Sequence, residues 1–180
     1  MQRTRLLEAM AYVVAERGYV KTSVAAVLKR AGVGRETFYE LFSDKEDCFL
    51  AAYDSVVELM LSVSSQALDE DGDPLERWSR SLADYLSTLG AHPEVARTFL
   101  IEVYAAGPRA IGKRGELQQR FVDLVAENFR ARDEDDRFAC EALVAATSSL
   151  VTTRVGAGAA ETLPALHEPL VGLARRLLAR

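Results

Sequence analysis

Apolar residues recur at three- and four-residue intervals along almost the whole chain, which is the spacing that gives a helix one apolar face. No segment alternates between apolar and polar residues for long enough to predict a strand. The pattern therefore predicts an all-α fold with about nine helices. The first four are expected from about Thr4 to Arg17, from a cap at Thr22 or Ser23 to about Ala31, from Arg35 to Phe42, and from a capping box of Ser43 with Glu46 to about Leu68.

Turn-forming and helix-starting residues separate the later helices. Helices are expected from Leu75 to Leu89, from Pro93 to near Ala106, from Glu116 to Arg132, after the charged turn 132–136 to Gly156 or Gly158, and from about Leu163 to Ala179. The start of the seventh helix stays open, because Gly107, Gly112 and Gly115 interrupt the residues before Glu116.

Composition and charge narrow the class of protein. Of the 180 residues, 49% are hydrophobic and 27% are charged, as in an ordinary soluble domain. No apolar stretch is long enough to predict a membrane span, so a cytoplasmic location is expected. Cys48 and Cys140 are far apart and lack metal-ligand spacing, so each is interpreted as a buried apolar residue.

The net charge of −5 argues at first against a nucleic-acid partner. Its distribution weakens that objection, because residues 1–47 carry eight Lys or Arg against seven Asp or Glu. The amino-terminal quarter is therefore at +1, and the remaining 133 residues carry −6.

Two short helices joined at Gly32 have the arrangement of a helix-turn-helix, whose second helix can enter the major groove of DNA. Spacing alone does not establish DNA binding, since glycine-linked short helices are common in all-α proteins. The second of these helices has two expected faces. Phe38, Leu41 and Phe42 should be buried, and the outward face should carry Arg35, Glu36, Tyr39, Glu40 and Ser43.

The segment "TSVAAVLKRAGVGRETFYELFSDKEDCFLAAYD", residues 22–54, resembles the DNA-binding segment of the TetR family of bacterial transcriptional regulators. The matching features are Thr22, Ala25 and Val27 before Ala31-Gly32-Val33, Thr37-Phe38-Tyr39, Phe42, and Lys45-Glu46. The resemblance implies a homodimer with a DNA-binding domain, here residues 1–47, and an effector-binding and dimerisation domain, here residues 48–180.

Carried onto this sequence, the resemblance and the side-chain chemistry give eight candidate DNA contacts. They are Thr22, Ser23, Gly34, Arg35, Glu36, Thr37, Tyr39 and Lys45. Hydroxyl groups, the Tyr39 phenol and the Lys45 ammonium suit phosphates, whereas the Arg35 fork suits a guanine edge. Thr22 and Ser23 have helix capping as an alternative role, which is compatible with DNA contact.

The glutamates of the third helix depart from the family pattern, which often has Ser at position 34 and a small residue at position 36. A carboxylate facing the groove is repelled by phosphates unless it accepts from cytosine N4. Glu36 also lies in the first helical turn, where the helix dipole alone would favour it. The sequence leaves base reading and dipole stabilisation both open for Glu36, with Glu40 the weaker candidate.

A pocket for an effector is expected among helices four to eight. Its candidate lining residues are Met60, Trp78, Tyr85, Phe99, Glu102, Tyr104, Phe121, Phe138 and Arg154, although each apolar one could be plain core. Candidate dimer contacts are Leu143, Ala146, Leu150, Leu163, Leu166, Leu170, Leu173 and Leu177. An intramolecular core explains those residues equally well.

The function predicted is therefore a TetR-like regulator, a repressor that binds a palindromic operator in double-stranded DNA as a homodimer and is released by a small-molecule effector. The alternative is a helical ligand- or partner-binding protein that no longer binds DNA. An enzyme is disfavoured, because the chain lacks G-x-S-x-G, HExxH, a phosphate-cradling glycine loop and a Cys/His dyad. Neither a cofactor nor a metal site is expected, and no membrane partner.

Overall fold

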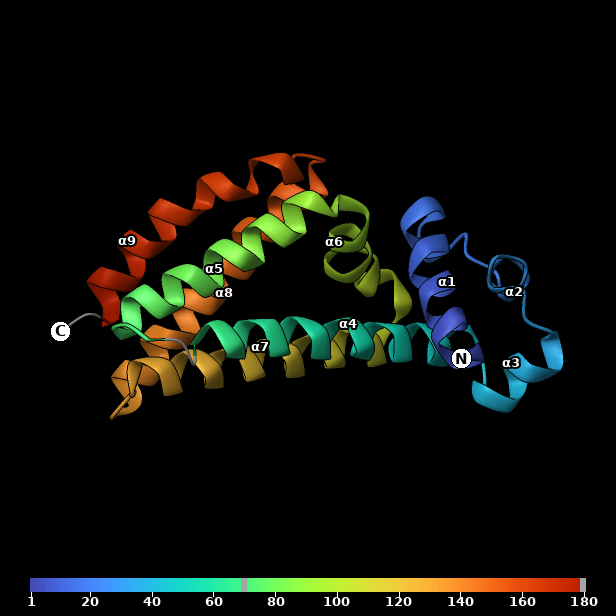
Figure 1. Ribbon diagram of the computed structural model, residues 1–180, viewed down its shortest axis with the longest axis horizontal. Coiled ribbons are helices and arrows are strands. Elements are labelled where there is room, and N and C mark those ends of the chain that lie inside the picture. The colour runs from blue at the N-terminus through green and yellow to red at the C-terminus, as the bar shows by residue number, and fades with distance from the viewer. Residues whose placement is uncertain (69–70, 179–180) are drawn as a thin grey trace. The chain divides into compact units, whose positions relative to one another are not determined.

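The computed structural model describes residues 1–68 and 71–178, and within that part every element is helical (Figure 1). This confirms the predicted all-α class with nine α-helices. The elements are α1 (Gln2–Arg17), α2 (Val24–Ala31), α3 (Arg35–Leu41), α4 (Lys45–Leu68), α5 (Pro74–Ala91), α6 (Pro93–Leu100), the 3-10 helix η1 (Glu102–Ala106), α7 (Pro108–Phe129), α8 (Glu134–Gly156), the 3-10 helix η2 (Ala160–Leu166) and α9 (His167–Leu178). The predicted end of the last helix at Ala179 lies outside the described residues.

Helix α4 does not begin with the capping box that the sequence predicted at Ser43 and Glu46. Asp44 accepts a hydrogen bond from the backbone N–H of Asp47 at 2.8 Å, and the Asp47 carboxylate accepts from the N–H of Ser43 at 3.0 Å. Asp44, one residue after the predicted cap Ser43, therefore satisfies one of the orphan N–H donors of the first turn of α4. A similar pair was missed before α5, where Asp73 and Glu76 form a complete capping box.

Prolines and glycines explain where the later helices differ from expectation. The sixth helix stops at Leu100 and continues as η1. Helix α7 starts at Pro108, because proline fits the first helical position, and it passes through Gly112 and Gly115. The last helical segment opens as a 3-10 helix that contains Pro164, a residue that cannot donate the backbone hydrogen bond of an α-helix interior.

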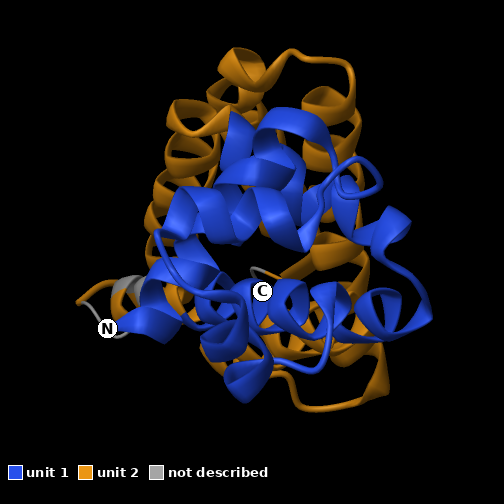
Figure 2. Cartoon of the chain, turned by 90° about the vertical axis from the view of Figure 1, so that its right-hand side faces the viewer, with its two compact units in different colours: residues 1–58, 94–113 blue, residues 59–93, 114–180 orange. Residues whose placement is uncertain are grey.

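The chain forms two compact units (Figure 2). Unit 1 comprises residues 1–58 and 94–113, and unit 2 comprises residues 59–93 and 114–180. The boundaries fall inside α4, after the first residue of α6 and inside α7, so each of these helices contributes residues to both units.

The core of unit 1 joins the three amino-terminal helices to the first half of α4. Leu6, Met10, Val27 and Phe38 are fully buried. A series of aromatic rings continues this core: Tyr19 to Phe49, Phe49 to Tyr53 and Tyr53 to Phe99, with centroid distances of 5.0, 6.5 and 5.5 Å. Residues of α6 are thereby packed onto α4 within the same unit.

Unit 2 is built around the packing of α5 and α8 against η2 and α9. Leu86 of α5, Leu143 of α8, Leu163 of η2 and Leu170 of α9 are buried together with other apolar residues of this unit. The Nε2 atom of His167 lies 3.0 Å from the carbonyl oxygen and 3.0 Å from the hydroxyl of Ser79. This histidine is therefore a polar tie between α9 and α5.

Helix α4 is long and apolar enough over Lys45–Gln66 to cross a membrane, by length and composition alone. The core helix of a folded domain has the same length and composition. In α4 the residues Cys48, Phe49, Tyr53 and Val57 are buried within unit 1, so part of its apolar character is accounted for by packing.

Candidate nucleic-acid interface

Helices α2 and α3 are joined by a three-residue turn, Gly32 to Gly34. Ser23 caps α2, because its hydroxyl accepts from the N–H of Ala26 at 3.2 Å. Gly32 ends α2 in the left-handed conformation, with φ 61° and ψ 42°, a conformation that favours glycine. Gly34 is extended at the start of α3. Local sequence chemistry thus fixes both ends of the turn.

Helix α3 presents one buried and one exposed face. Phe38 is fully buried and Phe42 is 4% exposed. Leu41 was predicted to join them but is 40% exposed, because it is the last residue of a seven-residue helix and the chain turns to extended backbone at Phe42. The opposite face carries Arg35, Glu36, Tyr39 and Glu40, all exposed as predicted.

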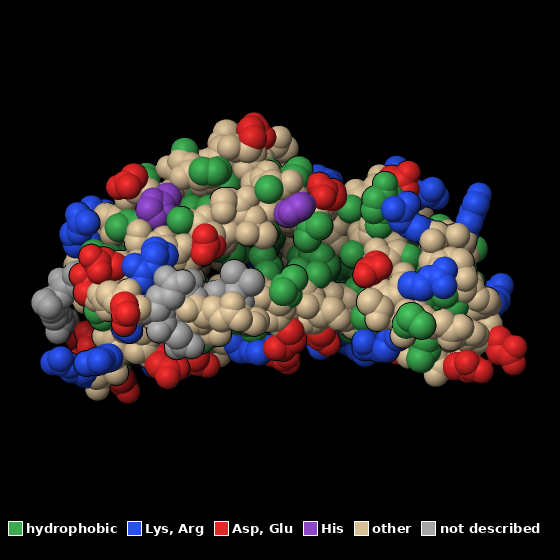
Figure 3. All heavy atoms as spheres, viewed as in Figure 1, with side chains coloured by type: hydrophobic (Ala, Val, Ile, Leu, Met, Phe, Trp, Pro, Cys, Tyr) green, Lys and Arg blue, Asp and Glu red, His purple; other side chains and the backbone are tan. Residues whose placement is uncertain are grey.

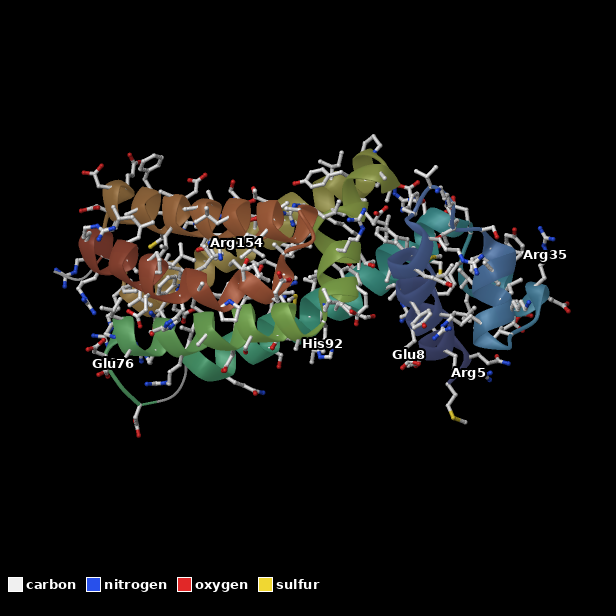
Figure 4. The ribbon with its side chains drawn as sticks, turned by 90° about the horizontal axis from the view of Figure 1, so that it is seen from above. Arg5, Glu8, Arg35, Glu76, His92 and Arg154 are labelled. Carbon is white, nitrogen blue, oxygen red and sulfur yellow. The ribbon has the colours of Figure 1, made fainter. Side chains whose placement is uncertain are left out.

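The exposed face of α3 carries mixed charge. Figure 3 shows acidic side chains over α3, and Lys and Arg side chains over α1 and α2. Arg35 points outward from the start of α3 (Figure 4), with its guanidinium carbon 5.7 Å from the centroid of the Tyr39 ring. An arginine and a phenol side by side on an exposed helix face can hydrogen-bond base edges and phosphates.

Of the other predicted DNA contacts, Ser23 and Gly34 are exposed and Thr37 is half-buried. Thr22 is only 3% exposed, and its hydroxyl donates to the carbonyl of Gly18 at 2.9 Å. The Thr22 side chain therefore closes the connection between α1 and α2.

Lys45 is held by the same connection. Its ammonium donates to the carbonyl of Tyr19 at 3.0 Å and lies 4.1 Å from the centroid of the Tyr19 ring. Burial lowers the pKa of Lys45, whereas burial and the nearby carboxylates of Glu46 and Asp44 raise the pKa of Tyr19. The sequence predicted that the Lys45 ammonium contacts a DNA phosphate. In this structure the same ammonium donates to a carbonyl of its own chain.

Glu102, in the part of unit 1 formed by residues 94–113, binds the connection between α1 and α2. Its Oε2 accepts from the backbone N–H of Tyr19 at 2.9 Å, and its Oε1 lies 3.4 Å from Nη2 of Arg97. A Cβ on Gly18 would come within 3.1 Å of the same Oε2. The sequence predicted Glu102 as a pocket-lining residue, but its partner Tyr19 is 83 residues away and carries no sequence signal.

The predicted effector residues divide between the two units. Phe99, Glu102 and Tyr104 belong to unit 1, and the other six belong to unit 2. Within unit 2, Trp78 packs on Phe129 and Tyr85 on Phe121, with centroid distances of 6.5 and 6.2 Å, and Met60 is half-buried.

Three of the effector candidates have other surroundings. Arg154 donates to the carbonyl of Thr162, which ties α8 to η2. Tyr104 and Phe138 are 51% and 70% exposed, so they lie on the surfaces of their units.

The predicted dimer residues divide between the interior and the surface of unit 2. Leu143, Leu163, Leu166 and Leu170 are at most 3% exposed, so these four belong to the core of their own chain, the alternative that the sequence left open. Leu150 and Leu177 are 43% and 37% exposed, and Ala146 and Leu173 are half-buried.

The amino-terminal helices match a known protein family in sequence. Residues 6–52 match the family model described as bacterial regulatory proteins, tetR family. The HTH-type transcriptional regulator EthR of Mycolicibacterium smegmatis is 27% identical over 150 residues, which are 82% of this chain and 58% of that protein. The fatty acid metabolism regulator protein of Bacillus subtilis is 21% identical over 121 residues, 67% of this chain and 62% of that protein. The chain thus matches less than two thirds of the length of either relative.

Solved structures share the fold over almost the whole chain. FadR from Bacillus subtilis, in complex with stearoyl-CoA, has a TM-score of 0.83 at 20% identity, covering 98% of this chain and 97% of that one. FadR from Bacillus halodurans has a TM-score of 0.82 at 22% identity, covering 98% and 94%. At these identities the likeness concerns the fold.

Proposed function

Because this chain is a member of the TetR family of bacterial transcriptional regulators, we propose that it is a cytoplasmic repressor that binds a palindromic operator as a homodimer and is released by a small-molecule effector. The observation that carries the proposal is the exposed face of α3, with Arg35, Glu36 and Tyr39 presented to solvent by a buried Phe38. A short helix anchored on one face and polar on the other suits entry into the major groove.

The roles of the α3 side chains follow from their chemistry. Arg35, in the first turn, reads a guanine, since its fork can donate to O6 and N7 together. Tyr39 and Ser23 contact phosphates and fix the register of the helix. The Lys45 ammonium contributes through its hold on Tyr19, which positions the connection leading into α2.

Dimerisation sets the spacing of the two copies of α3. Two half-sites one helical turn apart require a separation of about 34 to 36 Å. The exposed apolar residues Leu150 and Leu177 of unit 2 are the contacts proposed for a partner subunit, together with Ala146 and Leu173.

An acyl-CoA thioester is the effector class we propose to test first. The support is the fold shared with a FadR that was solved with stearoyl-CoA, and the sequence similarity to a fatty acid metabolism regulator. To release DNA, the effector need only prefer the non-binding form by a coupling energy of about 1 to 3 kcal/mol, or about 5- to 150-fold in affinity.

Selection from a pool of randomised duplexes tests operator binding directly. The expected result is enrichment of a palindrome with two equivalent half-sites, bound by the purified full chain at low salt. Failure to retain any duplex would overturn the proposal and favour a helical ligand-binding protein without DNA affinity.

The effector is tested by adding stearoyl-CoA to the complex of the chain with its selected duplex, followed by fluorescence anisotropy. Free coenzyme A and stearate serve as controls. Release by stearoyl-CoA at concentrations where both controls are inactive supports a thioester effector, and equal release by stearate would reassign the site to fatty acids.

A further inference from the structure

Basic residues from three helices flank the turn between α2 and α3, two of them before it and one after it in sequence and the fourth beside it in space. Lys29 and Arg30 lie in the last turn of α2, and Arg35 opens α3. The fourth is Arg5 of α1, whose Nη2 would lie 2.8 Å from a Cβ placed on Gly32. We call Arg5, Lys29, Arg30 and Arg35 the turn cluster.

Arg5 occupies a place that the sequence did not single out. It is 27 residues away from Gly32 along the chain, is exposed, and lies at the amino end of α1 (Figure 4). Its position follows from the packing of α1 on α2, which also places the guanidinium of Arg30 3.0 Å from the centroid of the Tyr12 ring. Tertiary packing thus adds a cation to a turn that already carries basic residues.

The charges around the proposed groove face make this cation important. Glu36 and Glu40 are exposed on α3, and each repels phosphates. Lys45, the cation expected at phosphate, donates to the carbonyl of Tyr19. A helix-turn-helix with this balance needs other cations for the backbone contacts that supply most of the salt-dependent affinity.

We propose that Arg5 is a phosphate-binding residue, which contacts the DNA backbone beside the groove that receives α3. The turn cluster is the phosphate site, and its ligand is the phosphodiester backbone of double-stranded DNA. In helix-turn-helix docking the first residues of the recognition helix reach base edges while neighbouring elements cross the backbone. Arg5, held against the turn that leads directly into α3, is at such a crossing point.

A purely structural role for Arg5 makes a different prediction. A cation near the carboxyl end of α2 also stabilises the exposed carbonyls and the helix dipole. In that case its removal lowers the stability of the fold and leaves the number of neutralised phosphates unchanged. Salt dependence separates the two roles, because each phosphate contact contributes about 0.9 to the slope of log K against log salt concentration.

The test rests on the proposed operator binding and uses the selected duplex with the full chain. Arg5→Gln is expected to lower the magnitude of the slope of log K against log salt concentration by about 0.9 per bound subunit. The ratio of wild-type to variant affinity should therefore fall about 3.5-fold per subunit when the salt concentration rises from 50 to 200 mM. Arg5→Lys keeps the charge and is expected to keep the slope. Ranking of operator variants should stay unchanged in Arg5→Gln, since phosphate contacts carry no sequence information.

Arg17→Gln is the matched control, because Arg17 lies at the other end of α1 and pairs with Glu16 at 3.3 Å. It removes the same charge from the same helix and should leave the slope unchanged. Glu8→Gln, on the same helix as Arg5 (Figure 4), removes a nearby negative charge and should tighten binding at low salt.

The outcomes distinguish this inference from the proposed function. A wild-type chain that retains no duplex overturns both. Wild-type binding with an unchanged slope for Arg5→Gln overturns the phosphate contact alone, whatever the change in thermal stability. An equal loss of slope in Arg17→Gln would also overturn it, because the effect would then reflect net charge and not position.

Discussion

At the scale of single residues, two features of the structure require glycine at position 32. Its φ of 61° is one that side chains with a Cβ rarely adopt, and Nη2 of Arg5 lies 2.8 Å from where that Cβ would be. Gly32→Ala is therefore expected to lower the free energy of unfolding by about 1 to 2 kcal/mol, measured by urea denaturation.

Gly34→Ala is the control, since the site has open space and an extended backbone. It should cost about half a kcal/mol or less. Equal losses for the two variants would show that the left-handed conformation of Gly32 is not what makes glycine necessary at this turn.

Glu36 is the residue of α3 whose charge opposes DNA binding most directly. It is exposed in the first helical turn, where its carboxylate faces the side proposed for the groove. Glu36→Gln is expected to tighten binding to all duplexes, because a repulsion is removed, and to cost about 0.3 to 1 kcal/mol of stability through the helix dipole. Competition among operator variants checks this, and weaker binding with relaxed preference at one base pair would instead show that Glu36 reads a cytosine.

At the scale of elements, Glu102 is expected to hold the connection between α1 and α2 in place. Glu102→Ala leaves the buried N–H of Tyr19 without its acceptor, so the free energy of unfolding should fall by about 1 to 3 kcal/mol.

Arg97→Ala removes the ion pair to Glu102 but leaves the Tyr19 hydrogen bond. Because the Arg97 side chain is 50% exposed, the free energy of unfolding should fall by less than about 1 kcal/mol. Urea denaturation of both variants measures the difference. If Arg97→Ala cost as much as Glu102→Ala, the ion pair and not the Tyr19 hydrogen bond would be the important contact.

At the scale of the whole molecule, the proposed dimer depends on exposed apolar residues of unit 2. Leu150 is 43% exposed on α8, and Leu150→Asp should convert the dimer to a monomer, because it would bury a charge at the partner contact. Operator affinity should fall about 100-fold or more as the two half-sites lose their linkage. Light scattering after size exclusion measures the mass.

Leu59→Asp is the control for that substitution, since Leu59 is 64% exposed on α4 and is not a proposed contact. It should leave the mass and the operator affinity unchanged. A dimer that persists in Leu150→Asp would move the interface away from this part of α8.

The amino-acid sequence by itself determined the all-helical class, the limits of α1 to α3 to within two residues, and the exposed face of α3. These features depend on periodicity, on capping at Ser23 and on glycine at position 32, which are local. It also carried the family resemblance, because the motif is contiguous along the chain.

Only the tertiary structure decided the contacts between residues far apart in sequence. It paired Glu102 with Tyr19 and Lys45 with the same residue, placed Arg5 against the turn at Gly32, and assigned four of the predicted interface leucines to the core. A helical pattern shows which face of a helix is apolar but not what covers it, since an interior contact and a subunit contact require the same residues. Local sequence therefore determined where the helices form, and tertiary packing determined which side chains contact one another.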